Sequence, residues 1–208
     1  MMLKRWLALC WLVLSVILPS AGWSEAVPTE GFAPVEGGRL FYQVMGEGEP
    51  LVLIHGGQLD HRMWDGQFER YAQEYRVIRY DVRGYGKSPA SISTPYSASD
   101  DLRDLLDHFG VGKAHIAGLS LGGRIASDFA VTYPDRVASL VLIGPGLTGF
   151  RDEDEKEGAT FWDFVEAVRD GGPEALADLW LKDPYLAPAA TNTALAARLR
   201  QLAVENAH

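Results

Sequence analysis

The feature that most constrains the fold of this chain is the pentapeptide Gly118–Gly122 (Gly-Leu-Ser-Leu-Gly), which lies between a strand-like run and a helical pattern. The run Ala114–Ala117 is predicted to be a short strand, and the helical pattern continues to Tyr133. In a tight turn from strand to helix, a serine projects its hydroxyl into a cleft, and glycines two positions away let the turn pack against neighbouring backbone. A bare G-x-S-x-G also arises as a glycine-rich turn with an incidental serine. The flanking strand and helix favour a candidate nucleophile, Ser120.

The rest of the first 149 residues alternates between strand and helix patterns. This alternation predicts a mostly parallel sheet with helices on both faces, and a ligand site at the carboxyl ends of the strands. A helix that Ser99 caps is expected to run through Phe109. The other expected elements are strands at Arg39–Val44, Leu51–Ile54, Tyr75–Tyr80 and Leu140–Ile143, and a helix at Met63–Glu74.

A second candidate group, His55-Gly56-Gly57-Gln58, follows the apolar strand Leu51–Ile54. Backbone N–H groups in such a loop stabilise a developing oxyanion together with the N–H of the residue after the nucleophile. We therefore expect donors at Leu121 and Gly57, with Gln58 in reserve. His55 is a candidate base, but a histidine at this place more often supports the turn by hydrogen bonding.

Three motifs in this order resemble the α/β-hydrolase superfamily: Leu51–Gly57, Asp81–Ser88 and Ala117–Gly123. The resemblance covers roughly Val35 to Gly146 and is strongest to the esterase, lactonase and carbon–carbon hydrolase branch. It implies an α/β-hydrolase fold with a helical cap, and no cofactor or metal.

The resemblance also implies roles for individual residues. Asp81 and Arg83 brace a loop. Ser120 attacks a carbonyl group, whereas relatives that cleave epoxides or carbon–halogen bonds carry aspartate at that place. Water then releases the acyl group from the serine.

The family order places an acid and then a histidine after the serine, each following a strand. The chain reaches His208 without such a strand, so we expect a truncated sequence whose acid and histidine lie beyond residue 208. His55, His61, His108 and His115 all precede Ser120. His61 lacks an evident acid partner, and His108 and His115 are expected to be structural. Without further strands, Leu140–Ile143 would be an exposed apolar edge.

Residues 150–208 are expected to form an incomplete helical cap over a core of residues 27–149. Its helices are predicted around Phe161–Arg169, Pro173–Leu181 and Thr193–Val204. Asp152 and Asp154 stand where some relatives place the acid, although a charged loop is the preferred interpretation. Five aromatic residues are candidates for an apolar pocket, but core packing is the commoner role at helical spacing: Trp64, Phe161, Trp162, Phe164 and Trp180.

Residues 1–26 have the pattern of a secretory signal peptide, with Lys4 and Arg5 before an apolar segment and small residues after it. The protein is therefore expected to be exported, either periplasmic or secreted. The alternatives are an uncleaved anchor and, more weakly, a lipoprotein attached through Cys10, the single cysteine. The apolar segment is short for a membrane span.

The net charge of −9 disfavours binding to nucleic acid or to an anionic membrane. The leading hypothesis is a serine hydrolase acting on a small ester, lactone or related carbonyl compound. The alternatives are a non-catalytic hydrolase-fold module that binds a ligand or partner, and a cofactor-free haloperoxidase-like side activity that would need the same triad.

Overall fold

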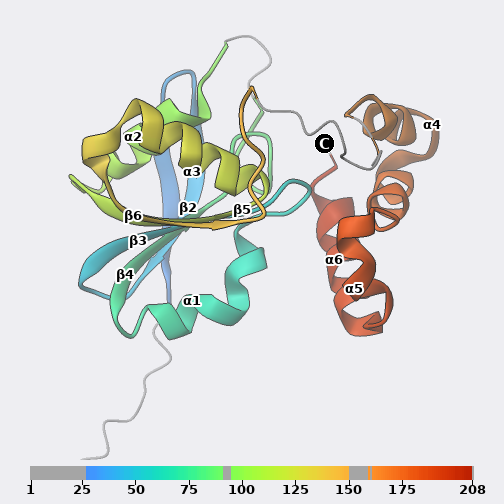
Figure 1. The fold of residues 1–208 in the computed structure, drawn as a ribbon, viewed down its shortest axis with the longest axis horizontal. Coiled ribbons are helices and arrows are strands. Elements are labelled where there is room, and N and C mark those ends of the chain that lie inside the picture. Colours follow the sequence, from blue (N-terminus) through green and yellow to red (C-terminus); the bar gives the residue numbers. More distant parts are fainter. Residues whose placement is uncertain (1–26, 91–94, 150–158, 160, 208) are drawn as a thin grey trace, which may run out of the picture.

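A six-stranded sheet with helices on both faces forms the body of the molecule (Figure 1). The computed structural model describes residues 27–90, 95–149, 159 and 161–207. The strands are β1 (Thr29–Val35), β2 (Gly38–Met45), β3 (Glu49–Ile54), β4 (Tyr75–Tyr80), β5 (Ala114–Leu119) and β6 (Val137–Ile143).

The strand order is β1-β2-β4-β3-β5-β6. The pairs β1–β2 and β2–β4 are antiparallel, and the pairs β4–β3, β3–β5 and β5–β6 are parallel. Ile54 pairs with Tyr80 on one side and with Gly118 on the other. The carboxyl ends of β3, β4 and β5 therefore lie side by side. The loops that begin at His55 and Asp81 and the turn at Ser120 all start at this end of the strands. This confirms the predicted mostly parallel α/β architecture.

Helices cover the two faces of the sheet unequally. Figure 1 shows α2 (Ala98–His108) and α3 (Leu121–Thr132) on one face and α1 (Asp65–Tyr71) on the other. Short 3₁₀ turns precede α1 and follow α3, at His61–Trp64 and Pro134–Arg136. The larger core cluster lies beneath α2 and α3, and the smaller one lies beneath α1.

The structure of the core differs from the sequence predictions at several places. Thr29–Val35, where the sequence predicted no strand, forms the edge strand β1, because pairing with β2 overrides its glycine and proline content. Ser97, and not Ser99, caps α2: its extended backbone lets the side chain accept from Asp100 N, whereas Ser99 is buried in the first turn. The predicted helix at Met63–Glu74 is shorter and starts as a 3₁₀ turn, which Asp60 caps.

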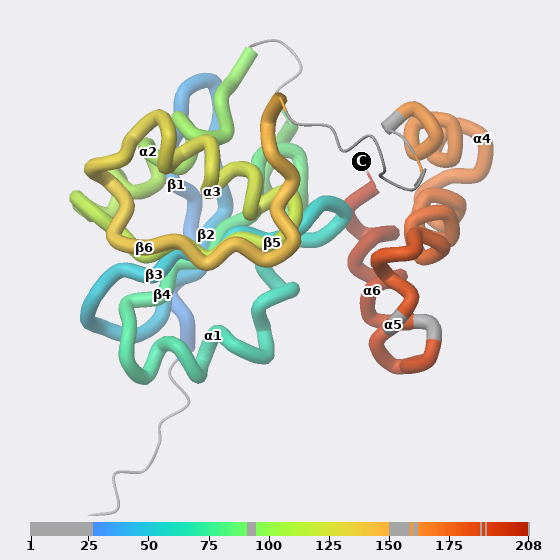
Figure 2. The backbone as a smooth tube through the Cα atoms, viewed as in Figure 1, coloured from blue at the N-terminus to red at the C-terminus, as the bar shows by residue number. Residues whose placement is uncertain are grey.

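The chain beyond residue 160 forms a separate group of helices beside the carboxyl ends of the parallel strands. It consists of α4 (Phe161–Trp180), α5 (Ala187–Ala190), α6 (Thr193–Glu205) and a 3₁₀ turn at Pro184–Leu186. Gly172, with φ 74° and ψ −170°, breaks α4 before Pro173, which matches the two helices expected there. Figure 2 shows the loop after β3 reaching toward the end of α6.

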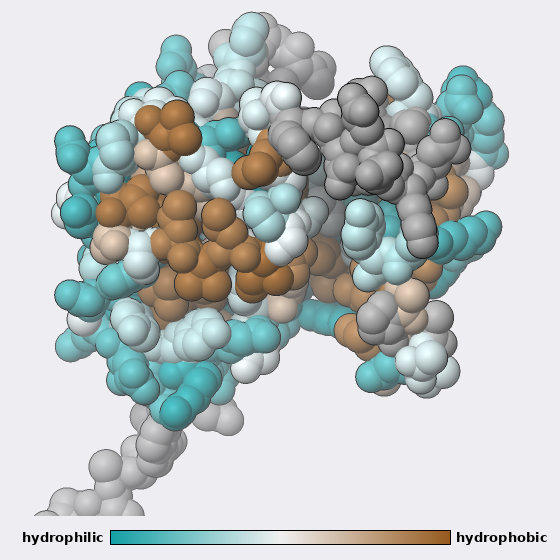
Figure 3. Space-filling model, viewed as in Figure 1, coloured by the Kyte–Doolittle hydropathy of each residue, from teal (hydrophilic) through white to brown (hydrophobic). Residues whose placement is uncertain are grey.

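Strand β6 forms the second edge of the sheet and carries exposed apolar side chains. Val141, Leu142 and Ile143 are 54%, 39% and 43% exposed, although such residues are usually buried in a parallel strand. Figure 3 shows apolar side chains gathered over this strand. Within the described part of the chain, no element covers this edge, as expected from the sequence.

Several sequence predictions lie outside the described residues. They are the signal peptide at residues 1–26 with Cys10, the charged loop with Asp152 and Asp154, and His208. Over the described ranges, every helix is too short or too polar to cross a membrane.

Candidate active site

Ser120 occupies the turn between β5 and α3 with an unusual backbone conformation. Its φ and ψ are 50° and −108°, and only Gln58 shares a positive φ among the described non-glycine residues. Such a conformation costs about 1–3 kcal/mol and persists only where the surroundings impose it. Ser120 N donates to Ile143 O at 2.9 Å, and Arg124 N donates to Ser120 O at 2.9 Å, so both sides of the turn are anchored. The residue is exposed, which leaves its side chain accessible.

The glycines around Ser120 are required by close backbone packing. A Cβ on Gly118 would lie 2.3 Å from Gly122 C, and a Cβ on Gly122 would lie 2.4 Å from Ile54 O. A Cβ on Gly123 would lie 2.9 Å from Pro145 Cβ. The G-x-S-x-G-G spacing is therefore explained by sterics: β5, the start of α3 and the end of β3 meet with no room for side chains.

Leu121 is the first residue of α3, so its N–H has no acceptor within the helix and lies at the positive end of the helix dipole. Its half-buried side chain packs on the larger core cluster. This placement leaves the N–H free to donate to an anionic oxygen next to Ser120.

His55 is fully buried and holds two loops together. Its Nε2 accepts from Val82 N at 2.9 Å, so the proton lies on Nδ1, which is 2.7 Å from Gly56 O and donates to it. Burial lowers the pKa of His55 despite the opposing effect of the Gly56 hydrogen bond. With both ring nitrogens engaged and the neutral form favoured, His55 is placed to support the loop and not to accept a proton from Ser120.

Gly57 and Gln58 complete this loop. A Cβ on Gly57 would meet nothing within 4 Å, so this residue borders open space, unlike Gly56, whose Cβ would lie 2.8 Å from Leu119 Cδ2. Gln58 has a φ of 60° and is half-buried. The loop thus carries strained backbone beside open space, which is the environment expected of an oxyanion-binding segment.

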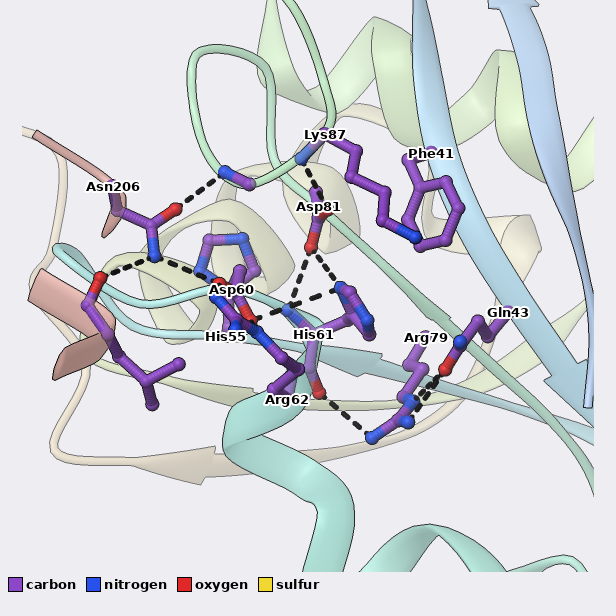
Figure 4. A network of polar contacts seen from close by, with 12 residues as sticks. Phe41, Gln43, His55, Asp60, His61, Arg62, Arg79, Asp81, Lys87 and Asn206 are labelled. Carbon is purple, nitrogen blue, oxygen red and sulfur yellow. Dashed lines mark hydrogen bonds and ion pairs between the residues drawn. The ribbon is translucent and has the colours of Figure 1, made fainter. Parts of the chain in front are cut away.

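Asp81 and Arg83 brace the loop that follows β4. Asp81 accepts from Lys87 N at 2.8 Å and from His61 N and Nδ1 at 2.8 and 2.7 Å (Figure 4). Arg83 forms two hydrogen bonds to Asp101 and is buried. The expectation that His61 lacks an acid partner is therefore wrong, because the fold brings the carboxylate of Asp81, twenty residues away in the sequence, to the His61 ring.

Asp60, His61 and Asp81 form the one group of described residues with the spacing of a metal site. Its carboxylate oxygens are already occupied. Those of Asp60 accept from Arg62 and Asn206, and those of Asp81 accept from His61 and Lys87. A cation would have to displace these donors, so the arrangement fits a structural hydrogen-bond network better than a metal site.

A cavity of about 440 Å³ lies between the loops after β3 and β4 and the helices α4 and α6. Its lining includes Gln58, Tyr85, Phe164, Val168, Leu176 and Asn206. Ser120 is not among the described lining residues, so the cavity adjoins the Gly57–Gln58 loop and not the serine itself. A larger open depression of about 730 Å³ lies on α4 and the residues before it, away from both motifs.

The five aromatic candidates have different environments. Trp64 is buried in the core beneath α1, and Trp180 packs within the helical group. Phe164 packs there too and lines the 440 Å³ cavity, whereas Trp162 is 70% exposed. The side chain of Phe161 lies outside the described structure. The pocket interpretation is therefore wrong for Trp64 and fits Phe164.

The remaining histidines serve the scaffold. His108 packs against the rings of Tyr42 and Phe109, and His115 bridges Ser139 and Glu49 across three neighbouring strands. Among the described residues, no histidine forms a hydrogen bond to the Ser120 hydroxyl. The roles of Ser120, Leu121 and Gly57 in a reaction thus remain predictions.

Sequence reasoning missed three residues of this region: Asp60, Tyr85 and Asn206. Asp60 precedes a helical turn and has the residue type of an N-cap, which is a usable signal. Tyr85 packs its ring against His55, with centroids 5.4 Å apart. Asn206 reaches Asp60 and Gly86 from the far end of the chain, and no local pattern announces that contact.

Comparisons with known proteins agree with this geometry. A family model described as the alpha/beta hydrolase fold matches residues 49–188, more than half of the chain. A 2-hydroxy-6-oxononadienedioate/2-hydroxy-6-oxononatrienedioate hydrolase from Burkholderia vietnamiensis is 40% identical over 120 residues, covering 53% of this chain and 41% of that protein. The chain spans less than half the length of the curated relatives it matches.

Solved structures show the same likeness. The enol-lactonase from Burkholderia xenovorans LB400 superimposes with a TM-score of 0.69 at 25% identity, covering 85% of this chain and 70% of that one. A carboxylesterase structure from Nitrososphaera gargenis gives a TM-score of 0.70 at 26% identity, covering 84% and 66%. The extent of the family match, together with the turn at Ser120, shows that this chain belongs to the α/β-hydrolase family and is related to hydrolases.

Proposed function

We propose that this chain carries the nucleophile and the oxyanion donors of a serine hydrolase that cleaves an ester, a lactone or a related carbonyl compound. The observation that carries the proposal is the backbone of Ser120, at φ 50°, between a strand and a helix whose glycines admit no side chain. Strained residues cluster at active sites, and a serine at a strand-to-helix turn of this kind is the position of the nucleophile in α/β-hydrolases.

The proposed reaction proceeds through an acyl-enzyme. The Ser120 oxygen attacks the carbonyl carbon, and the N–H groups of Leu121 and Gly57 stabilise the negative charge on the carbonyl oxygen. The alcohol or enol leaves with a proton, and water then attacks the acyl group and frees the serine. The named relatives support this chemistry, since a lactonase, a carboxylesterase and a carbon–carbon hydrolase all act at a carbonyl carbon.

Serine needs a general base for this attack. His55 uses both ring nitrogens in the loop, His61 is buried and bonded through Nδ1 to Asp81, and among the described residues neither ring forms a hydrogen bond to Ser120. We therefore propose that the base and its acid partner lie beyond residue 208, on strands that would also cover β6. Sequencing the gene past codon 208 tests this. An open frame with a strand-like run before an Asp or Glu, and another before a His, is expected. A frame without a histidine after a strand would contradict the proposal.

The test of the nucleophile is hydrolysis of p-nitrophenyl esters and simple lactones by this chain and by any longer product of the same reading frame. We expect Ser120→Ala to lower the rate by about four to six orders of magnitude in the active form. Ser127→Ala is the matched control, because its hydroxyl donates only to Gly123 O within the same helix. Mass spectrometry after an acid quench should find the acyl group on Ser120.

A non-catalytic binding module is the alternative, and the cavity of about 440 Å³ is the observation that favours it. If no form of the protein hydrolyses any of these compounds, and Ser120→Ala changes only ligand affinity, the alternative holds. Equal hydrolysis by wild type and Ser120→Ala would likewise exclude the acyl-enzyme.

We also propose that residues 1–26 direct export of the protein. The basic start and apolar segment of this region support the proposal. Expression in a bacterial host and N-terminal sequencing of the periplasmic fraction test it. A mature N-terminus near residue 22 or 27 is expected, and a protein that keeps Met1 in the cytoplasm would contradict it.

A further inference from the structure

Asn206 forms the buried polar link between the helical group and the sheet. It caps the end of α6 and is 4% exposed. Its Nδ2 donates to Asp60 Oδ2 at 2.9 Å and to Leu202 O at 2.8 Å, and its Oδ1 accepts from Gly86 N at 2.6 Å (Figure 4). One side chain thus uses both its donor group and its acceptor to join three segments.

The two core partners of Asn206 belong to the loops that wall the 440 Å³ cavity. Asp60 ends the segment that contains Gly57 and Gln58, and Gly86 follows Tyr85. Gln58, Tyr85 and Asn206 all line the cavity. The Asn206 amide therefore sets the spacing between these two loops and α6.

Two ion pairs also join α6 to the core, but both lie at the surface. Arg62 contacts Glu205 at 2.5 Å, and Arg198 contacts Asp65 at 3.0 Å, with side chains 31–50% exposed. Exposed pairs of this kind contribute about 0–1 kcal/mol each. The buried amide is less replaceable, because its loss takes the acceptor from the Gly86 N–H and leaves Arg62 as the one described side-chain donor to Asp60 Oδ2.

The chemistry of the position requires an amide. An aspartate would lose the donor to Asp60 and would place two carboxylates within hydrogen-bond distance. An aliphatic residue would neither accept from Gly86 N nor donate to Asp60 Oδ2. The opposite wall of the cavity consists mainly of apolar side chains from α4: Phe164, Val165, Val168 and Leu176.

We infer that Asn206 is a positioning residue that holds the loops of Gln58 and Tyr85 against α6 and thereby keeps open an apolar cavity for the acyl or alkyl group of the substrate. The identity of the occupant as a substrate group rests on the proposed function. The positioning role of Asn206 is a property of the folded chain and does not depend on the reactivity of Ser120.

The test uses the 208-residue chain and the neutral apolar fluorophore N-phenyl-1-naphthylamine, with hydrogen–deuterium exchange in parallel. We expect Asn206→Asp to weaken fluorophore binding about tenfold and to speed exchange in residues 56–60 and 84–88. Asn192→Asp is the matched control: the same change at the other end of α6, where the side chain only caps Leu195 N and an aspartate caps equally well.

A double variant tests whether a donor at position 60, opposite the new carboxylate, reverses these effects. Asp60→Asn combined with Asn206→Asp should recover part of the affinity and protection, because an amide again faces a carboxylate, whereas Arg62 loses its charged partner and Leu202 O loses its donor. If Asn206→Asp frays only α6 and leaves the fluorophore affinity and both loops unchanged, Asn206 is merely a helix cap and the inference fails. If the protein shows no esterase activity but Asn206→Asp still weakens fluorophore binding and speeds exchange in both loops, only the proposed reaction is contradicted. The positioning role of Asn206 then stands.

Discussion

Ser120 shows how backbone conformation and neighbouring glycines act together at a single residue. Its positive φ is unfavourable for serine, yet Ser120 N and Ser120 O are both hydrogen-bonded, and the glycines on each side let three backbone segments meet. The strain is offset by packing of the whole turn. A residue of this kind is informative about function because stability alone would favour glycine there.

Two glycines of the site are expected to differ in how far alanine changes the stability of the protein. In Gly122→Ala, the gain in helix propensity of about 1 kcal/mol is outweighed by contact with Ile54 O, 2.4 Å from the new Cβ, and overpacking against backbone costs about 1–3 kcal/mol or more. Gly57→Ala places its methyl group in open space and should leave stability unchanged. Urea unfolding followed by far-UV circular dichroism measures both. Equal stability of the two variants would mean that the turn relaxes around a side chain.

At the scale of secondary-structure elements, β6 is an edge strand whose apolar side chains are left exposed. Its neighbour β5 is buried between β3 and β6, whereas β6 has one partner and exposes apolar side chains on both faces. Such an edge offers unpaired backbone groups to any strand that approaches it.

We expect Val141→Lys to reduce aggregation of the 208-residue chain. A lysine on an edge strand opposes pairing with another strand, and Val141 is 54% exposed, so the folded state loses little. Val131→Lys is the control: it removes an even more exposed valine, at 83%, from the helix α3. Light scattering during storage or slow heating is the measurement. If both variants aggregate equally slowly, net charge and not the edge of β6 is responsible.

At the scale of the whole molecule, a buried charged network connects the helical group to the sheet. Burial would raise the pKa of Asp60, but hydrogen bonds from Arg62 and Asn206 outweigh this effect and lower the pKa well below its ordinary value of 3.8. A carboxyl group whose pKa is lower in the folded state stabilises that state above its unfolded pKa, and this contribution is lost as the pH falls.

The stabilisation lost in Asp60→Asn should therefore depend on pH. We expect the variant to be less stable than wild type at pH 7, and the difference to shrink as the pH falls below about 4. Asp178→Asn is the control, since Asp178 pairs with Arg200 at an exposed site and should change stability little at any pH. Urea unfolding at pH 7, 5, 4 and 3 measures the differences. A difference between Asp60→Asn and wild type that stays constant across this range would contradict the expectation.

Much of the sheet and of the turn at Ser120 was predictable, because their signals are local. Apolar runs predict buried strands, alternation with helices predicts a mostly parallel sheet, and G-x-S-x-G between a strand and a helix predicts the turn. Helix and strand ends were less accurate, as β1 and the cap at Ser97 show, since tertiary pairing and the conformation of one residue decide them.

The sequence by itself thus determined the α/β architecture, the strained serine with its glycines, and the loop at His55, because backbone sterics and hydrophobic periodicity act over a few residues. Tertiary structure alone decided which groups meet across the chain. It gave His61 an acid partner in Asp81, engaged both nitrogens of His55, and brought Asn206 to Asp60 across 146 positions. Hydrogen bonds between distant segments depend on where the packed core places them, and no local pattern records that placement.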